Sequence, residues 1–244
     1  MSDMDAEIKD LTLRVRNLEN NILYSQLHDK KRIPNDPAIH EQVQRAYIAV
    51  TIRYGLYSSV FKWVPENYYS LTLAQRAKIL GASSTWQLCK SMLMENKAFD
   101  ESLSSKDGSY SRFYLIVLQY ETSISNKKLI SEVRALKQPV TKRYDFNKFD
   151  FRVASSEDND RLTGYTHNAV SPFGLLDNES VTIIVSKSIT ETATVSKTPS
   201  FIWMGGGHVH CKLGMATSDF INALNPLILD VTEPKSGDVG EDNL

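Results

Sequence analysis

A segment near the C-terminal end of the sequence contains three residues of types that bind transition metals. These residues are His208, His210 and Cys211. Alternate side chains of a strand share one face, so His208 and His210 would lie together while Cys211 points to the other face. Three ligands therefore do not converge, and ordinary strand alternation accounts for the pattern better than a metal site. We expect the protein to use neither a metal nor a cofactor.

Other motifs for common chemistries are incomplete or absent. The sequence contains no GxSxG nucleophile elbow and no GxxxxGK[ST] phosphate loop. His40 and Glu41 resemble the start of the zinc-protease motif HExxH, but Gln44 stands where the second zinc ligand is required. No helical pattern follows Gly205–Gly207, which excludes a dinucleotide-binding loop. These glycines leave the backbone open to close approach by a ligand.

A basic stretch between residues 127 and 152 is a candidate for contacts with phosphate. Its cations are Lys127, Lys128, Arg134, Lys137, Lys142, Arg143, Lys148 and Arg152, and its interleaved aromatic residues are Tyr144, Phe146, Phe149 and Phe151. Clustered Lys and Arg side chains provide sequence-independent affinity for RNA. A solvated charged face beside buried aromatic residues gives the same pattern. The sequence leaves both interpretations open.

The overall composition predicts one globular core without a global attraction to nucleic acid. The chain has 244 residues, of which 41% are hydrophobic and 23% are charged, and its formal net charge is −1. Cys89 and Cys211 are the only cysteines, which argues against a disulfide framework or a zinc ribbon. The N-terminal residues lack a signal-peptide pattern, and no apolar run reaches the ~20 residues that span a bilayer. We therefore expect a soluble, cytoplasmic protein with no membrane partner.

The elements that must position any site follow from hydrophobic spacing. Residues 1–28 contain apolar side chains alternately four and three positions apart, which is the spacing of a coiled coil. They are Met4, Ile8, Leu11, Val15, Leu18 and Ile22. Residues 4–22 are therefore predicted to form a helix that pairs with a second copy or with another protein; a helix folded back on its own domain is the alternative. Pro34 and Pro37 mark residues 29–37 as a linker.

Residues 38–231 are predicted to form the globular body, and residues 232–244 a disordered acidic tail. Helices are predicted over residues 39–52, from the capping box Thr72–Gln75 to Gly81, and from Thr217 onward, while a second capping box, Ser84–Gln87, opens the segment after Gly81. Strands are predicted over residues 112–120, 181–186, 201–204 and 208–213, with Gly205–Gly207 as the bend between the last two. Helices come first and strands follow without a βαβ rhythm, which favours an α+β fold.

The segment from Thr163 to Gly174 resembles the signature loop of the YbaK/ProX family, which has a Gly-Tyr opening, a GxxxP element and a closing Pro-(apolar)-Gly. Upstream, residues 79–81 and 87–93 resemble the LG…V(F/Y)KTL stretch of that family. Downstream, residues 203–207 and the helix that follows are similar to its Gly-Gly turn and C-terminal helix. The resemblance covers roughly residues 74–224, and its three pieces stand in the family's order.

This resemblance implies both a fold and an activity. The fold would be a mixed, largely antiparallel curled sheet flanked by helices. The family hydrolyses mischarged aminoacyl-tRNA, either as an inserted domain of prolyl-tRNA synthetase or as a free-standing protein. This chain would then be a metal-independent, trans-acting aminoacyl-tRNA deacylase that removes a small amino acid, such as Ala, Cys or Ser, from mischarged tRNA. The alternative is a weakly catalytic or non-catalytic tRNA-binding subunit, tethered to a synthetase assembly through its N-terminal helix.

The resemblance also implies site residues. Lys90 matches the functional lysine of the family, which engages the acceptor end of the tRNA and holds the ester in place. The implied substrate-binding residues are Gly164, His167, Asn168, Ala169, Ser171, Pro172, Gly205, Gly206 and Gly207. Asn168 stands where the family has the first glycine of GxxxP, and asparagine tolerates a left-handed backbone better than other non-glycine residues. No general base is evident, so catalysis would come from positioning and backbone electrostatics.

Overall fold

The structure is a computed structural model that describes residues 40–104, 107–195 and 200–235, together with residues 4, 7–12, 14 and 15. Its largest sheet has five strands, in the order β5 (Phe151–Val153), β2 (Cys89–Asn96), β3 (Phe113–Gln119), β6 (Val181–Ser186) and β9 (Leu227–Leu229). The sheet is mixed, because β2 runs antiparallel to β3 and β5, whereas β6 runs parallel to β3 and β9.

Two smaller sheets are antiparallel. One has the order β1 (Val60–Trp63), β8 (Cys211–Ala216) and β7 (Phe201–His208), and the other pairs β10 (Thr232–Pro234) with β4 (Thr122–Ile124). A parallel bridge between Leu88 and Trp203 joins the three-stranded and five-stranded sheets. The predicted α+β class with mixed and antiparallel sheets is confirmed, although the strands divide among three sheets instead of forming one curled sheet.

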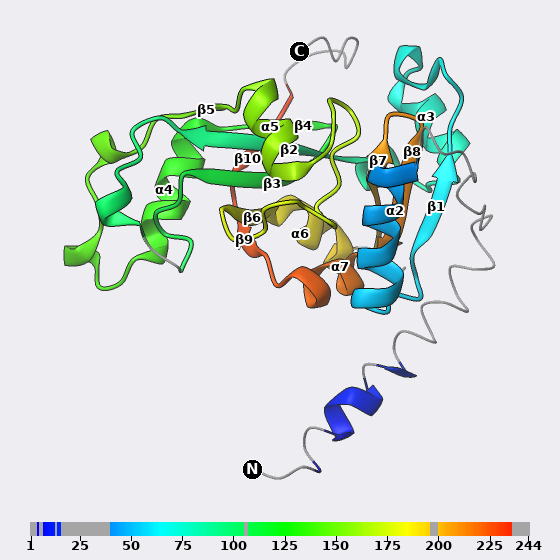
Figure 1. Ribbon diagram of the computed structural model, residues 1–244, viewed down its shortest axis with the longest axis horizontal. Coiled ribbons are helices and arrows are strands. Elements are labelled where there is room, and N and C mark those ends of the chain that lie inside the picture. Colours follow the sequence, from blue (N-terminus) through cyan, green and yellow to red (C-terminus); the bar gives the residue numbers. More distant parts are fainter. Residues whose placement is uncertain are drawn as a thin grey trace.

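Helices flank these sheets. The α-helices are α2 (His40–Ile48), α3 (Leu73–Leu80), α4 (Asn126–Leu136), α5 (Ser156–Thr163), α6 (Lys187–Val195) and α7 (Thr217–Leu224). A π-helical segment, η1 (Ala49–Arg53), continues α2, and short 3₁₀ turns are η2 (Tyr68–Ser70), η3 (Thr85–Gln87), η4 (Glu101–Leu103), η5 (Val140–Lys142) and η6 (Phe146–Lys148). Figure 1 shows α4 at the end of the molecule that holds β5, and α2 and α3 at the end that holds β1 and β8.

Of the two capping boxes that the sequence predicts, the first is present in the structure and the second is not. At the start of α3, the Thr72 hydroxyl accepts a hydrogen bond from the Gln75 amide, the Gln75 side chain accepts one from the Thr72 amide, and Gly81 ends the helix at φ 76°. The Ser84 hydroxyl accepts instead from the Trp86 amide and opens only the 3₁₀ turn η3. The chain leaves this turn for strand β2, whose pairing with β3 determines its conformation.

The three consecutive glycines lie within a strand. Strand β7 runs through Gly205–Gly207, and the chain turns at Val209 and His210 before β8 begins at Cys211. The predicted bend at Gly205–Gly207 is therefore wrong. Local sequence favours a turn at these glycines, but pairing with β8 keeps them within the strand. The register is irregular between Gly205 and His208, and Gly207 has a positive φ of 94°.

Apolar side chains form three clusters in the described part of the chain. The largest includes Val43 of α2 and Leu213 of β8. A second packs Leu129 of α4 against Ile116 of β3, and a third includes Leu80 of α3. Helix α2 thus packs on the three-stranded sheet, and α4 packs on the five-stranded sheet. Each of the two sheets that meet at the junction is therefore stabilised by a helix.

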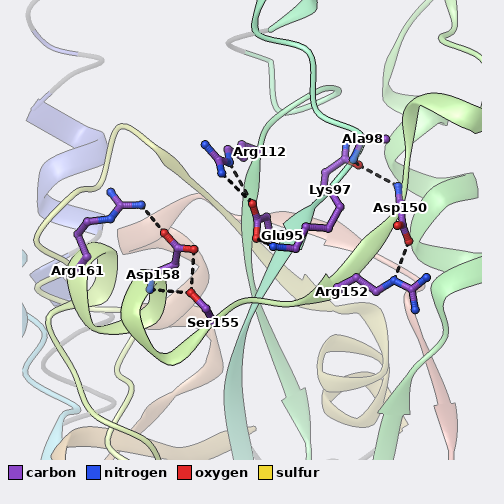
Figure 2. A network of polar contacts seen from close by, with 10 residues as sticks. Glu95, Lys97, Ala98, Arg112, Asp150, Arg152, Ser155, Asp158 and Arg161 are labelled. Atoms are coloured by element: carbon purple, nitrogen blue, oxygen red, sulfur yellow. Dashed lines mark hydrogen bonds and ion pairs between the residues drawn. The ribbon is translucent and has the colours of Figure 1, made fainter.

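A buried carboxylate lies at one end of the five-stranded sheet. Glu95 of β2 is 2% exposed and accepts hydrogen bonds from Arg112 at 3.0 and 3.1 Å, and it also pairs with Lys97. Figure 2 shows this group beside the Asp150–Arg152 pair. Although burial raises the pKa of Glu95, the hydrogen bonds and charges of Lys97 and Arg112 outweigh that effect and hold the pKa below its usual value.

The two ends of the chain were predicted to be a coiled-coil-like helix and a disordered tail. The described residues between Met4 and Val15 are helical, and the apolar side chains among them are exposed: Met4, Ile8, Leu11 and Val15. Leu18, Ile22 and the linker lie outside the described residues. The tail prediction is wrong for Thr232–Pro234, which pairs with β4 as strand β10, and residues 236–244 also lie outside the described part. Within the described residues, none of the helices is long and apolar enough to cross a bilayer.

Candidate functional site

A cavity of about 920 Å³ lies where the two larger sheets meet. Strands β2, β3, β7 and β8 contribute to its wall, together with η2, α5 and the segment that follows α5. The predicted site residues in this wall are Lys90, His167, Asn168 and Gly205. The structure thus brings together residues from all three segments that carry the resemblance.

Lys90 enters the cavity from strand β2. Its backbone pairs with Leu118 of β3, and its side chain is half-buried. The ammonium lies 5.6 Å from the centre of the Tyr120 ring, a distance at which a cation is attracted to the ring face. The neighbouring Cys89 also lines the cavity, but its side chain is only 2% exposed, and burial raises its thiol pKa far above the usual value. Lys90 is therefore the polar residue of this pair that a ligand in the cavity can reach.

The loop from Gly164 to Gly174 is held at both ends by Arg45 of α2. Arg45 donates from Nη2 to the Gly164 carbonyl at 2.5 Å and from Nε to the Gly174 carbonyl at 2.8 Å. Its guanidinium also lies 4.7 Å from the centre of the Tyr165 ring, and the Tyr165 hydroxyl donates to the Phe173 carbonyl at 2.6 Å. Both end glycines have positive φ, 71° and 72°. One arginine thereby closes the ends of the loop into a fixed shape.

Asn168 adopts the backbone conformation expected for a glycine replacement. Its φ is 63°, in the left-handed region, and its carbonyl accepts a hydrogen bond from the Tyr69 hydroxyl at 2.9 Å. Asn168 thus has the left-handed conformation that asparagine tolerates better than other non-glycine residues. His167 and Asn168 are both exposed at the cavity wall, so their side chains are accessible to a ligand.

The glycines of β7 allow this loop to pack directly on the strand. A Cβ at Gly205 would lie 2.2 Å from the Val170 carbonyl oxygen, and one at Gly207 would lie 2.7 Å from the Gln42 carbonyl oxygen of α2. The Gly207 amide donates to the Ala169 carbonyl at 3.1 Å. The backbone of Val170 and of Gln42 thus occupies the space that side chains at Gly205 and Gly207 would need. Of the glycines in β7, only Gly205 lines the cavity.

The other predicted substrate-binding residues support the loop without lining the cavity. They are Gly164, Ala169, Ser171, Pro172, Gly206 and Gly207. Ala169 and Ser171 are fully buried, and the Ser171 hydroxyl accepts a hydrogen bond from the Phe173 amide at 3.2 Å. Only some of the residues implied by the resemblance therefore face the open space of the cavity.

Sequence reasoning missed Lys212, which lines the same cavity. Lys212 is 5% exposed in β8, a strand whose six residues are all buried. Its ammonium nitrogen donates to the Tyr69 hydroxyl at 2.6 Å. Burial lowers the pKa of Lys212 to about 7; the nearby Arg76 acts in the same direction and Cys211 in the opposite one. The available signal was a lysine inside an otherwise apolar strand.

The charges around the cavity suit an anionic ligand. Lys90 and Lys235 line it as cations, and Asp160 is the one carboxylate that the described residues place in the wall. Arg76 is buried behind this wall and lies 5.2 Å from the centre of the Tyr69 ring. Cations in a partly closed site attract anions more strongly than exposed cations do, because the local dielectric constant is lower.

The basic stretch of residues 127–152 lies outside the cavity wall. Its ion pairs with carboxylates of the chain are Lys128–Asp230, Lys137–Asp107, Lys148–Asp100 and Arg152–Asp150. Phe149 and Phe151 are buried in the core, and Arg134 donates to the Tyr144 carbonyl at 2.7 Å. These contacts favour the interpretation of a charged face beside core aromatic residues.

The histidines considered as metal ligands pack against an aromatic ring. His208 stacks on Trp63 with ring centres 5.0 Å apart, and His210 lies 5.4 Å from His208. Burial lowers the pKa of His208, and the charges of His210 and Lys212 add to this effect. The described residues contain no group of three metal-binding side chains.

Comparison with known proteins connects this chain to one fold. No family model matches the sequence, and no curated protein is similar to it at a significant level. A proposed trans-editing enzyme for prolyl-tRNA synthetase superimposes with a TM-score of 0.56 at 15% identity, over 82% of this chain and 99% of that chain. A hypothetical protein, APE2540, gives a TM-score of 0.53 at 18% identity, over 79% and 100% of the two chains.

A third solved structure, from work on the computational grafting of linear epitopes onto scaffold proteins, has a TM-score of 0.57 at 14% identity and covers 80% of this chain and 98% of that chain. At such identities the likeness concerns the fold alone. The fold expected from the sequence motifs is confirmed at that level: this chain has an α+β fold that resembles that of a proposed trans-editing enzyme for prolyl-tRNA synthetase.

Proposed function

We propose that this protein is a trans-acting aminoacyl-tRNA deacylase that hydrolyses the ester of a mischarged tRNA carrying a small amino acid. The observation that carries the proposal is the position of Lys90, which lines the same cavity as Asn168 of the signature loop and Gly205 of β7. These residues come from three distant segments, each of which resembles the same editing family. The fold likeness to a proposed trans-editing enzyme agrees with this assignment.

The cavity suits the acceptor end of a charged tRNA. A terminal nucleotide brings phosphate groups, and Lys90 and Lys235 provide cations at the wall. Tyr120 lies beside Lys90 in the same wall and provides an aromatic contact for the terminal base. The aminoacyl group would then lie near the loop at His167 and Asn168, whose backbone is fixed through Arg45 and Tyr69.

Small amino acids are the natural substrates of such a site. A synthetase pocket cannot strongly reject a near-isostere of its cognate amino acid, so hydrolysis after transfer supplies the missing discrimination. Alanine, cysteine and serine on a non-cognate tRNA are the substrates we propose. Rigid positioning of the ester relative to a water molecule provides a large part of the acceleration in such reactions.

Deacylation of tRNAs mischarged with alanine, cysteine or serine tests the proposal. We expect the wild type to hydrolyse at least one of them and Lys90→Ala to lose most of this turnover. Lys127→Ala is the matched control, because Lys127 is an exposed lysine outside the cavity wall. Absence of hydrolysis of all three by the wild type would contradict the proposal, as would full turnover by Lys90→Ala.

A second candidate function is a tRNA-binding subunit that docks on a synthetase or on another copy of this chain. The observation that favours it is the row of exposed apolar side chains on the N-terminal helical segment: Met4, Ile8, Leu11 and Val15. Deletion of residues 1–36 tests this role. We expect the shortened chain to lose its partner in sedimentation or pull-down assays while residues 40–235 keep tRNA binding; unchanged association would exclude docking through this segment.

A further inference from the structure

Lys212 occupies a position where packing alone disfavours a lysine. It is the second residue of β8, pairs with Gly205 of β7 on one side and with Lys62 of β1 on the other, and is 5% exposed. Burying an ammonium group without a counter-charge costs far more free energy than burying an apolar side chain of similar size. Among the described residues, no carboxylate lies within ion-pair distance of the Lys212 ammonium. The lysine at this position therefore suggests a function that a hydrophobic residue cannot supply.

A chain of hydrogen bonds holds the Lys212 amine next to the signature loop. The amine donates to the Tyr69 hydroxyl at 2.6 Å, and that hydroxyl donates to the Asn168 carbonyl at 2.9 Å. The centres of the Tyr69 and Tyr68 rings lie 4.5 and 5.3 Å from the amine nitrogen. Three contacts from η2 thus fix the amine at the cavity wall, beside the loop that would hold the aminoacyl group.

The surroundings of Lys212 favour its neutral form. Titratable and charged groups lie on the elements packed around Lys212 and along the same cavity. They are Tyr68, Tyr69, Arg76, Lys62, Cys211, His208, Cys89, Lys90, Tyr120, Asp160, His167 and Lys235. Burial is the largest influence and Arg76 adds to it, so the pKa of Lys212 lies at about 7. At neutral pH a large share of these amines carries an unprotonated lone pair, which is the form that accepts a proton.

We propose that Lys212 is the general base of the ester hydrolysis, an inference that rests on the proposed function. The amine takes a proton from the attacking water while the water oxygen bonds to the ester carbonyl carbon. The bond between that carbon and the ribose oxygen then breaks, and the ribose oxygen takes the proton back from the Lys212 ammonium. The products are a free amino acid and a tRNA with a free terminal hydroxyl. Lys90 would hold the acceptor end during both steps.

The dependence of turnover on pH tests this role. On the member of the alanine, cysteine and serine panel that the wild type hydrolyses fastest, single-turnover rates are measured between pH 5.5 and 9 and corrected for uncatalysed hydrolysis. A base must be unprotonated, so the wild-type rate should rise with pH and level off above about pH 7. Lys212→Met should lower the rate constant on the order of 10²- to 10⁴-fold, change KM little and remove this rise.

Two further variants separate a base from a simple cation. Lys212→Arg keeps a positive charge but cannot lose its proton near neutral pH, so it should be as inactive as Lys212→Met. Lys62→Met removes a lysine directly across the strand pair and outside the cavity wall, and it should keep the wild-type rate and pH profile. Full activity of Lys212→Arg would overturn the role of Lys212 as a general base. It would mean that this position requires only a positive charge.

The outcomes also distinguish this inference from the function on which it rests. Hydrolysis by the wild type together with an unchanged pH profile in folded Lys212→Met would overturn the role of Lys212 alone. No hydrolysis by the wild type would overturn both. If circular dichroism shows that Lys212→Met does not fold, the pH dependence of the wild-type rate still tests the proposal. A wild-type rate that does not rise between pH 6 and pH 8 contradicts a general base at Lys212.

Discussion

At the scale of single residues, the cavity wall combines two features that cost free energy to maintain. Asn168 has a left-handed backbone at φ 63°, which L-residues other than glycine adopt at a cost. Lys212 is a lysine buried without a carboxylate partner among the described residues. Tyr69 contacts both of them through one hydroxyl. Backbone strain and a buried amine that converge on one side chain are typical of a site selected for function instead of stability.

The left-handed backbone of Asn168 makes a testable prediction. Alanine has no side-chain hydrogen bond that favours this conformation, so Asn168→Ala should lower the free energy of unfolding by about 1 kcal/mol. Asn168→Gly should cost less, because glycine adopts positive φ without a Cβ clash. Asn178→Ala is the matched control, since Asn178 is exposed in the same connecting segment and does not have a positive φ. Urea unfolding measures all three; equal losses for alanine at both positions would contradict the argument.

At the scale of elements, α2 positions the signature loop through one side chain. Arg45 donates to carbonyls at both ends of the loop, and hydrogen bonds from a charged donor contribute about 1.5–3 kcal/mol each. Arg45→Met should therefore lower the free energy of unfolding by at least about 2 kcal/mol and speed up amide hydrogen exchange over residues 164–174. Exchange in the buried strand β6 should change less.

Arg53→Met is the control for this prediction. Arg53 lies at the end of the π-helical segment that continues α2, and its side chain is exposed. Its replacement removes the same charge without touching the loop. Faster exchange of residues 164–174 in Arg53→Met, or unchanged exchange in Arg45→Met, would show that the loop does not depend on the two carbonyl contacts.

The elements that the sequence predicts well are those with local causes. Helix α3 follows from its capping box and Gly81, and β6 has the predicted bounds because its β-branched run is continuous. The glycine segment of β7 was mispredicted because its conformation depends on distant partners. Val170 and α2 approach where side chains are missing, and no local pattern in residues 205–207 reports this contact. The same holds for η3, where pairing of β2 with β3 overrides a helix-start signal.

At the scale of the whole molecule, the site could be predicted only where a motif carried it. Lys90 and Asn168 were accessible through resemblance, because each stands in a recognisable segment. Tyr69 and Lys212 are 143 residues apart in the sequence, and their hydrogen bond depends on the fold bringing η2 against β8. Spacing and periodicity describe neighbours along one element, so they contain no information about such a pair. The general base proposed for Lys212 therefore required the structure.

The pH dependence of stability tests how the five-stranded sheet is held at the end away from this site. The pKa of Glu95 lies below its usual value in the folded protein, since Lys97 and Arg112 stabilise the carboxylate. A carboxyl whose folded pKa is lowered stabilises the protein above its unfolded pKa, and this stabilisation is lost as the pH falls through the folded pKa. Glu95→Gln should thus lower the free energy of unfolding by about 1–3 kcal/mol at pH 7, and its difference from the wild type should shrink below pH ~4.5.

The neighbouring pair in Figure 2 provides the control for this measurement. Asp150 and Arg152 form an ion pair at 2.8 Å, but both side chains are substantially exposed. Exposed pairs contribute about 0–1 kcal/mol, so Asp150→Asn should change stability little at any pH. Denaturant unfolding of the three proteins between pH 3 and pH 7 separates the two cases. A loss for Glu95→Gln that stays constant over this range would mean that Glu95 contributes through packing and not through its charge, because only the charge is removed by acid.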